Sequence, residues 1–160
     1  MPKIFVALAT YNGERFLAQM LDSLLKQNRP ADLIFAVDDA SSDSSVRILD
    51  EYAKKLPMQV SVRQKNGGHR QAFSDALIAI QKVASDEDFI AIADQDDIWL
   101  PQKLAILEQQ LLQHSANFVF GDAHVIDADG KSIAASWRSL AGICPQIPFC
   151  ARLCGTNNAN

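Results

Sequence analysis

The sequence predicts an α/β protein built on a mostly parallel central sheet. Short apolar runs of strand length alternate with longer stretches in which apolar residues recur every three or four positions. A polar or glycine-containing loop follows each apolar run. Because parallel neighbours need crossover connections, commonly helices, this alternation predicts helices on both faces of the sheet.

The first half of the chain contains two such units. Residues 4–9 form a continuous apolar run, and helical spacing of apolar residues follows over 16–25. A second apolar strand is expected over 33–37. Ser41-Ser42-Asp43 can cap the next helix, which carries apolar residues between positions 46 and 53.

The pattern then continues through two further units. Residues 58–62 alternate in polarity as a strand does, and a helix is expected over 72–80. The apolar run 89–93 predicts a central strand, and Pro101 is typical of the first turn of the helix that follows, which carries apolar residues to Leu111.

Less regular elements are expected further on. Residues 117–120 predict a fifth short strand, and Asp127-Ala128-Asp129-Gly130 predicts a hairpin turn between 125–126 and 132–133. After Ser136 the periodicity fades. With 160 residues, 48% of them hydrophobic, the chain can bury one core, so we expect a single domain over 1–160.

Composition excludes several function classes. The 15 basic and 19 acidic residues leave a formal charge of −4, which argues against general nucleic-acid binding. No apolar run is long enough to span a bilayer, and the N-terminus enters a strand directly, so we expect a cytoplasmic protein, with the inner face of the membrane as an alternative position. Cys144, Cys150 and Cys154 form no CxxC pair and are expected to be free thiols.

Four polar loops follow the expected parallel strands and should meet at the carboxyl edge of the sheet, where open α/β folds bind ligands. They are Thr10-Tyr11-Asn12, Asp38-Asp39, the segment from Asn66 to Arg70, and Asp94-Gln95-Asp96-Asp97. The last holds three carboxylates beside a buried strand and therefore needs a counter-ion. Hard oxygen ligands suit Mg²⁺ or Mn²⁺ carrying a phosphate.

Different loops can bind different parts of a nucleotide. Asp38 or Asp39 can accept a hydrogen bond from a ring NH such as that of uracil or thymine, and Tyr11 can stack or lend its hydroxyl. Thr10 offers a short hydroxyl, and Arg70 a fixed charge near the phosphates. Of Asp94 and Asp96, one can hold the ribose and the other the metal. Strand alternation would turn Asp97 away from Asp96.

Each of these residues also has a simpler structural interpretation. The acids of the Asp94 loop could cap the helix near Pro101, although three acids with three matching loops favour a site. One of Asp38 and Asp39 could cap a helix while the other binds. Glu14 could favour its helix N-terminus, and Trp99 is expected to pack.

Several blocks of the sequence occur together in one known family. They are the opening block Ala7-Leu8-Ala9-Thr10-Tyr11-Asn12-Gly13-Glu14 with Leu21-Asp22-Ser23-Leu24 and Gln27, then Val37-Asp38-Asp39-Ala40-Ser41-Ser42-Asp43, Asn66-Gly67-Gly68, and the run from Asp94 to Leu104. In this order they resemble family 2 glycosyltransferases of the GT-A fold, nearest the bacterial rhamnosyltransferase-like and polysaccharide-assembly branch. The resemblance covers about residues 3–135.

The resemblance implies a Rossmann-like three-layer fold whose nucleotide-sugar-binding part spans about 1–135. It implies inverting transfer of a sugar from a UDP- or dTDP-type donor to an acceptor hydroxyl, a saccharide or lipid-linked saccharide, in cell-surface polysaccharide assembly. The metal ligands would be Asp94 and Asp96, holding Mn²⁺ or Mg²⁺. The nucleotide-binding set would comprise Thr10, Tyr11, Asn12, Glu14, Asp38, Asp39, Asn66, Arg70, Asp94 and Gln95.

The resemblance also implies a general base on the acceptor side, expected beyond Asn160, which would leave residues 136–160 as an incomplete acceptor-side segment and impair catalysis by this chain. Asp122 and His124 are the substitutes within the chain. Two alternatives stay open: a non-catalytic nucleotide-sugar-binding module, and a sugar nucleotidyltransferase, which should carry a basic glycine-rich loop where this chain has residues 10–14. Peripheral membrane association is compatible with the family, and the oligomeric state is not predicted.

Overall fold

The computed structural model describes residues 1–141 and divides the chain into two compact units, Met1–Ala105 and Ile106–Asn160. Strands and helices alternate through the first unit. Its elements are β1 (Ile4–Thr10), α1 (Leu17–Leu25), β2 (Leu33–Asp38), α2 (Ser45–Tyr52), β3 (Met58–Val62), α3 (His69–Gln81) and β4 (Phe89–Asp94), and α4 (Lys103–His114) begins in it.

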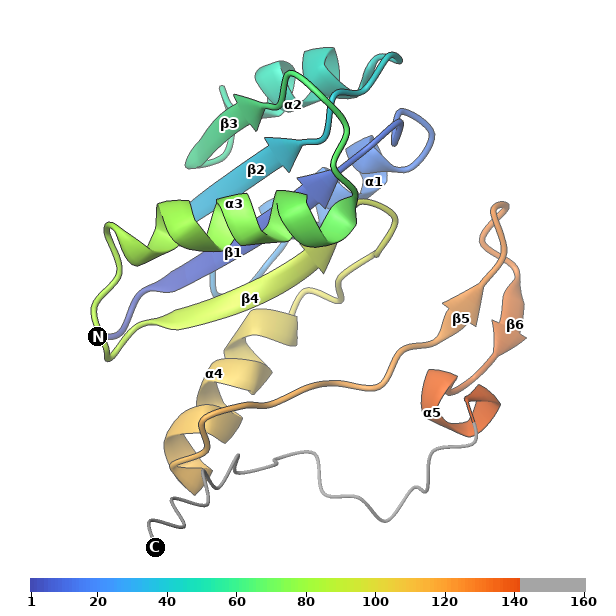
Figure 1. The fold of residues 1–160 in the computed structure, drawn as a ribbon. Helices are drawn as coiled ribbons and strands as arrows, with labels where there is room; N and C mark the ends of the chain where they lie inside the picture. Colours follow the sequence, from blue (N-terminus) through green and yellow to red (C-terminus); the bar gives the residue numbers. More distant parts are fainter. Residues whose placement is uncertain (142–160) are drawn as a thin grey trace, which may run out of the picture. The chain divides into compact units, whose positions relative to one another are not determined.

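The four strands of the first unit form one parallel sheet in the order β3-β2-β1-β4 (Figure 1). The strand order reverses beside β1, because β2 and β3 extend the sheet on one side of β1 and β4 on the other. Such a reversal point is where open α/β sheets bind ligands, at the carboxyl ends of the strands. The parallel α/β fold expected from the alternating pattern is confirmed.

Helices cover both faces of the sheet, as three layers require. On one face, Ile4, Val6 and Leu8 of β1 pack in a core that takes Leu17 and Leu21 from α1 and also includes residues of α2 and α4. On the other face, Phe5 and Ala7 of β1 and Phe35 of β2 pack with Ala76 and Ile80 of α3. Alternate residues of β1 therefore enter opposite cores, and every residue of that strand is buried.

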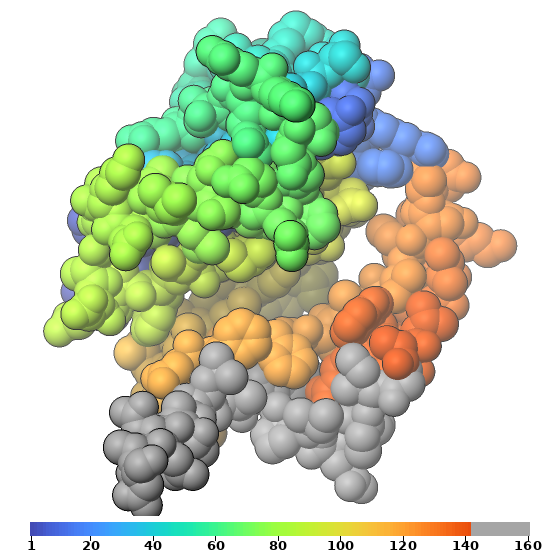
Figure 2. Space-filling model, in the orientation of Figure 1, coloured from blue at the N-terminus to red at the C-terminus, as the bar shows by residue number. Residues whose placement is uncertain are grey.

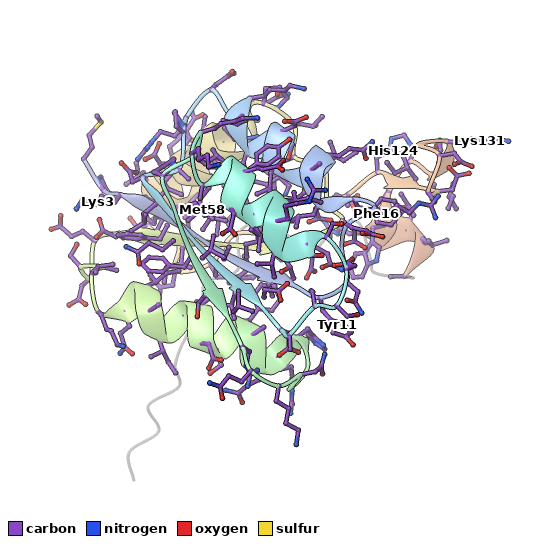
Figure 3. The ribbon with its side chains drawn as sticks, turned by 90° about the horizontal axis from the view of Figure 1, so that it is seen from above. Lys3, Tyr11, Phe16, Met58, His124 and Lys131 are labelled. Carbon is purple, nitrogen blue, oxygen red and sulfur yellow. The ribbon has the colours of Figure 1, made fainter. Side chains whose placement is uncertain are left out.

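Figure 1 shows α3 lying across one face of the sheet, and in the space-filling view of Figure 2 the atoms of this helix hide most of β1. In Figure 3, Lys3 and Tyr11 mark the opposite ends of β1. Tyr11 lies at the carboxyl edge, where the polar loops begin.

The second unit contains the hairpin expected at residues 127–130. Strands β5 (Val125–Ile126) and β6 (Ser132–Ala134) pair antiparallel, and Gly130 takes the left-handed φ of 81° in the turn. A short helix, α5 (Trp137–Leu140), follows.

The expected strand over 117–120 is not formed; within the described residues this segment has only an isolated bridge at Val119. Its apolar pattern comes from Phe118 and Phe120, whose rings pack on each other with centroids 5.9 Å apart. Within the described residues, the apolar run therefore forms a local aromatic pair and a single bridge instead of a strand.

Candidate functional site

The four polar loops meet at one edge of the sheet, as the topology requires. The strand register sets Thr10 opposite Asp38 and Ala9 opposite Asp94. The ends of β1, β2 and β4 are therefore level, and the loops that follow them begin side by side.

Asp38 is fully buried at the end of β2, and its carboxylate is occupied by the protein itself. Its Oδ2 accepts hydrogen bonds from the hydroxyls of Thr10, at 2.9 Å, and Ser41, at 2.6 Å. Its Oδ1 accepts from the Ser41 amide at 2.8 Å. In this structure Asp38 and Thr10 bind each other and fasten the β1 and β2 loops together.

Asp39 is equally buried and organises a different loop. Its carboxylate accepts hydrogen bonds from the Gly67 amide, at 3.0 and 3.1 Å, and from the Gly68 amide at 2.7 Å. The Arg63 guanidinium pairs with it at 3.1 Å and also reaches Asp75, at 3.2 Å. Asp39 therefore sets the conformation of the turn between β3 and α3, where Asn66 is exposed.

A set of hydrogen bonds joins the β1 loop to the start of α2. The side-chain oxygen Oδ1 of Asn12 accepts a hydrogen bond from the Ser42 backbone amide at 2.9 Å, and the backbone amide of Asn12 donates to the Ser41 hydroxyl at 2.8 Å. Glu14 Oε2 accepts from the Ser44 amide, at 3.0 Å, directly before α2. Glu14 thus caps the second helix rather than its own, and both Asn12 and Glu14 shape the loop from within.

Gln95 links the acidic loop to the β1 loop. Its Oε1 accepts from the Tyr11 amide at 2.7 Å, and its Nε2 donates to the Tyr11 carbonyl at 3.1 Å. A Cβ at Gly13 would lie 2.5 Å from that Oε1, so glycine is needed there for Gln95 to fit. The Tyr11 side chain is half exposed and can meet a ligand.

The acids after β4 form a concentration of negative charge. Desolvation raises the pKa of Asp94, the charges of Asp97 and Asp96 raise it further, and His69 acts in the opposite direction. Like charges this close favour either a proton or a cation at the site. The arrangement therefore fits a divalent cation.

The strand alternation used to predict the direction of Asp97 does not extend to this residue. The strand ends at Asp94 and a turn follows, closed by a hydrogen bond from the Asp97 amide to the Asp94 carbonyl. Alternation does not apply beyond the strand, and the charges of both Asp97 and Asp96 raise the pKa of Asp94. Asp97 therefore joins Asp94 and Asp96 as a candidate metal ligand.

Within residues 1–141, no three His, Cys, Asp or Glu side chains converge as a preformed metal cage. Mg²⁺ and Mn²⁺ bound beside phosphates are commonly held by one or two carboxylates, with the phosphate oxygens and water as the other ligands. The donor set found at the end of β4 fits that kind of site.

Arg70 lies in the first turn of α3 and is exposed. With His69 it lines one end of a groove of about 670 Å³ that runs between α3 and β4. The remainder of the groove is mostly apolar, including Phe73, Ile90 and Ile92. Arg70 is thus near the edge of the sheet, but it does not take part in the hydrogen bonds that join the β1 loop to the start of α2.

Asp122, in the second unit, serves as a cap for α5. It accepts hydrogen bonds from the Ser136 hydroxyl at 2.5 Å, from the Arg138 amide at 3.1 Å and from the Ala123 amide at 2.9 Å. The Ser136 hydrogen bond, together with those of Arg138 and Ala123, holds the pKa of Asp122 below its ordinary value. This geometry favours a structural role over that of a general base. His124 pairs with Ser132 across the hairpin, at 2.7 Å.

Two buried polar residues near the site carry roles that the sequence patterns did not reveal. Ser23 and Gln27 lie on α1 and just after it, four positions apart among buried leucines, and both contact the segment that follows the acids. The detectable signal was a polar pair at helical spacing on an apolar face. Trp99 is buried as expected, with the Lys103 ammonium 4.0 Å from its ring centroid.

Two sequence predictions concern other parts of the chain. Cys144, Cys150 and Cys154 lie outside the described residues. Among residues 1–141, no helix has both the length and the apolar character needed to cross a bilayer.

Comparison with known proteins identifies the family. The model described as glycosyl transferase family 2 matches residues 5–153. The dTDP-rhamnosyl transferase RfbG of Shigella flexneri is 30% identical over 113 residues, which cover 69% of this chain and 38% of RfbG. The poly(ribitol-phosphate) β-N-acetylglucosaminyltransferase TarS of Staphylococcus aureus is 32% identical over 130 residues, which cover 79% of this chain and 20% of TarS.

Solved structures agree with this assignment. The crystal structure of S. aureus TarS 1-349 in complex with UDP superposes with a TM-score of 0.64 at 29% identity, covering 72% of this chain and 33% of that one. The mannosyltransferase PcManGT of Pyrobaculum calidifontis, in complex with GDP-Man and Mn²⁺, shares the fold with a TM-score of 0.61 at 23% identity, over 79% of this chain and 36% of that one. This chain spans well under half the length of the curated relatives it matches. With a family model that covers nearly all of its residues and an α/β sheet of the GT-A type, the chain belongs to glycosyl transferase family 2.

Proposed function

We propose that this chain forms the donor-binding part of an inverting glycosyltransferase that uses a UDP- or dTDP-sugar. The observation that carries the proposal is the convergence of the β1, β2, β3 and β4 loops at one sheet edge, with carboxylates at the end of β4. The names of two relatives support the donor class, since TarS was crystallised with UDP and with UDP-GlcNAc and RfbG is named as a dTDP-rhamnosyl transferase.

The base of the nucleotide would lie between the Tyr11 side chain and the turn that Asp39 organises. Tyr11 is half exposed and can stack on a base, while Asp39 holds the backbone of Gly67 and Gly68 in place. In this arrangement Asp39 sets base preference by direct contact or through that turn. Thr10, Asp38, Asn12 and Glu14 would act by fixing the loops that surround the nucleotide.

The diphosphate would lie beside Asp94, Asp96 and Asp97. A divalent cation bound there stabilises the charge that develops on the departing diphosphate. Because two solved structures of the same fold contain Mn²⁺, Mn²⁺ is the first ion to test, and Mg²⁺ the second. Arg70, at the first turn of α3, would add positive charge on the same edge.

Activation of the acceptor hydroxyl needs a carboxylate beyond those that would hold the metal, and the described residues offer none at this edge that is not already engaged. Asp122 is engaged by three donors in its own unit. The transfer reaction, an acceptor in polysaccharide assembly and any position at a membrane are therefore part of the proposal only. Family membership does not favour either alternative, the binding module or the nucleotidyltransferase.

The proposal is tested by calorimetric titration of the chain with UDP and dTDP, with and without Mn²⁺. We expect the parent chain to bind these nucleotides more tightly when Mn²⁺ is present. In Asp96→Ala and in Asp97→Ala, the increase in affinity caused by Mn²⁺ should be lost, while the circular dichroism spectrum stays unchanged. Asp86→Ala is the matched control, an exposed aspartate in the loop before β4. If both loop variants kept the full Mn²⁺ increment, the proposed metal site would be wrong.

Base preference is tested separately with Asp39→Asn. We expect the variant to lose its preference for uridine or thymidine diphosphates over guanosine diphosphate, because Asn cannot hold the Arg63 guanidinium and two amides as a carboxylate does. A variant with undiminished preference would show that Asp39 does not govern base recognition.

A further inference from the structure

The acidic loop is fixed at its two ends by different parts of the fold. At the upstream end, Asp94 is paired with β1 in the sheet. At the downstream end, the segment 99–104 is held by groups from α1 and the turn after it. Residues 95–98 connect these two anchors, and Gln95 is also tied to the Tyr11 backbone, so these contacts together limit the positions of the acids.

The downstream anchor consists of Ser23 and Gln27, which are 5% and 6% exposed. The Ser23 hydroxyl accepts from the Trp99 amide at 3.0 Å. Gln27 Nε2 donates to the Leu100 carbonyl at 2.9 Å, and Gln27 Oε1 accepts from the Leu104 amide at 3.1 Å.

All these bonds go to the backbone of the downstream segment rather than to its side chains. A fourth bond, from the Asn28 amide to the Pro101 carbonyl at 2.7 Å, runs beside them. Backbone contacts fix the path of the chain whatever the side chains are, so they act on loop geometry directly. Gln27 also donates to the Ser23 carbonyl at 3.0 Å, which ties its own side chain to α1.

Capping of α4 alone does not account for this arrangement. The Leu104 amide needs one acceptor, which Gln27 Oε1 supplies, and a carboxylate would supply it equally well. The amide nitrogen of Gln27 adds the bonds to Leu100 and Ser23, which a carboxylate could not donate. The side-chain amide of Gln27 therefore also holds the segment that precedes α4 in place.

We propose that Gln27, assisted by Ser23, is a positioning residue that holds the acidic loop in the geometry required to bind the metal–diphosphate group. Gln27 touches neither the metal nor the nucleotide. It acts as the outer partners of a metal site do, by limiting the positions of the ligands. This inference rests on the proposed function, because it assumes that Asp96 and Asp97 meet a cation there.

The test uses Gln27→Met, which keeps the length of the side chain and removes all of its hydrogen bonds, and Gln27→Glu, which keeps an acceptor for Leu104. Ser23→Ala is a milder third variant that removes the acceptor for the Trp99 amide and the hydroxyl's own bond to the Met20 carbonyl within α1, and it remains informative if Gln27→Met fails to fold. Gln109→Met, an exposed glutamine of α4, is the matched control.

Mn²⁺ affinity is measured at saturating UDP, and UDP affinity is measured without metal. We expect the Gln27 variants to bind Mn²⁺ about 10- to 100-fold more weakly, as loss of an outer-shell partner does elsewhere, with metal-free UDP binding retained. Trp99 fluorescence in a Trp137→Phe background provides a second measurement, because the indole lies in the anchored segment and Mn²⁺ quenches nearby fluorophores.

The outcomes separate the two proposals. If the parent chain shows no Mn²⁺-assisted UDP binding, the proposed function fails. If the parent binds and folded Gln27→Met or Ser23→Ala matches it in Mn²⁺ affinity, the positioning role is wrong. An equal loss of metal-free and metal-assisted binding would also overturn it, since that result indicates a general structural defect.

Discussion

The Gln95 side chain and the Tyr11 backbone exchange two hydrogen bonds, of 2.7 Å and 3.1 Å, across the edge of the sheet. An amide side chain in this position imitates one rung of a β-ladder between the β1 loop and the acidic loop. Through this pair, the residue that can stack on a base and the residues that can hold a metal share one local framework.

The first prediction concerns the glycine that makes room for this pair. In Gly13→Ala the new Cβ would meet Gln95 Oε1 at 2.5 Å, so the flexible amide will turn aside and release Tyr11. We expect a loss of about 1 kcal/mol in the free energy of unfolding in urea, together with weaker UDP binding.

Gly121→Ala is the control, because a Cβ there meets nothing within 4 Å. Gln95→Ala should reproduce the effect of Gly13→Ala, and the double variant should show no further loss, since both changes remove the same pair. Additive losses would contradict this interpretation.

The second prediction concerns the buried bond between Thr10 and Asp38. Thr10→Val keeps the shape of the side chain but leaves the Asp38 carboxylate with one donor fewer, and Asp38→Asn alters all its contacts. We expect each single variant to lose about 1–3 kcal/mol. A double-mutant cycle by urea unfolding should give a coupling energy of about 0.5–3 kcal/mol, and a coupling near zero would show that the bond contributes nothing.

The third prediction concerns the pH dependence of stability at Asp32. Desolvation raises the pKa of this carboxyl, but hydrogen bonds from the Ile4 amide and the Arg29 guanidinium, both at 2.8 Å, outweigh it and lower the pKa below its ordinary value. Its stabilising contribution is therefore present above the unfolded pKa of about 3.9 and is lost as the pH falls through the folded pKa.

Asp32→Asn should accordingly be less stable than the parent at pH 7 by about 0.5–1.5 kcal/mol, and the difference should vanish in acid. Urea unfolding from pH 7 to pH 2 measures it, with the exposed Asp50→Asn on α2 as control. A difference that stayed constant across that range would rule out the ionic contribution.

The fourth prediction concerns Tyr52, which joins α2 to α1. Its hydroxyl donates to Asp22 Oδ1 at 2.6 Å and lies 3.2 Å from the Ala18 carbonyl. Desolvation, with the Asp22 hydrogen bond and charge, raises the pKa of Tyr52 to about 12. Because the folded pKa lies above the unfolded value, this contribution is complete below pH of about 10 and is lost as the pH rises toward the folded pKa.

Tyr52→Phe should therefore be less stable than the parent at pH 8 by about 1–2 kcal/mol, and the gap should narrow above pH of about 10. Chemical denaturation across the alkaline range measures the gap. Tyr11→Phe, which alters an exposed ring, is the control for general effects of the substitution. A gap that widened with rising pH would contradict a raised pKa for Tyr52 in the folded state.

Most of the fold was predictable because its signals are local. The run 4–9 is apolar through its length, as a buried parallel strand is, and helical spacing is visible over 16–25. The run 89–93 is equally apolar and does form a strand, but the central position predicted for it is wrong, because β4 lies at the edge of the described sheet and leaves Ile90 and Ile92 exposed. The failed strand over 117–120 shows the limit of such signals, since this segment has the apolar pattern of a strand but only an isolated bridge at Val119 within residues 1–141.

The candidate site was predictable as a set of loops but not as a set of roles. Parallel topology brings the residues after each strand to one edge, so Thr10, Asp38 and Asp94 could be grouped from their positions alone. Whether a carboxylate faces a ligand or an internal donor depends on side chains far away in the sequence. Asp38 is taken up by Thr10 and Ser41, and Glu14 by the start of α2.

Local period and composition were enough to predict the succession of strands and helices through residue 111, the class of sheet and the loops that carry the acids, because these signals act over a few residues. The way in which those loops are held depends instead on contacts between segments that are distant in the sequence. Gln27 meets Leu100 and Leu104 across 73 and 77 positions, and Gln95 meets Tyr11 across 84. No local pattern encodes such contacts, since hydrogen bonds between distant segments exist only once the sheet has set its strands side by side.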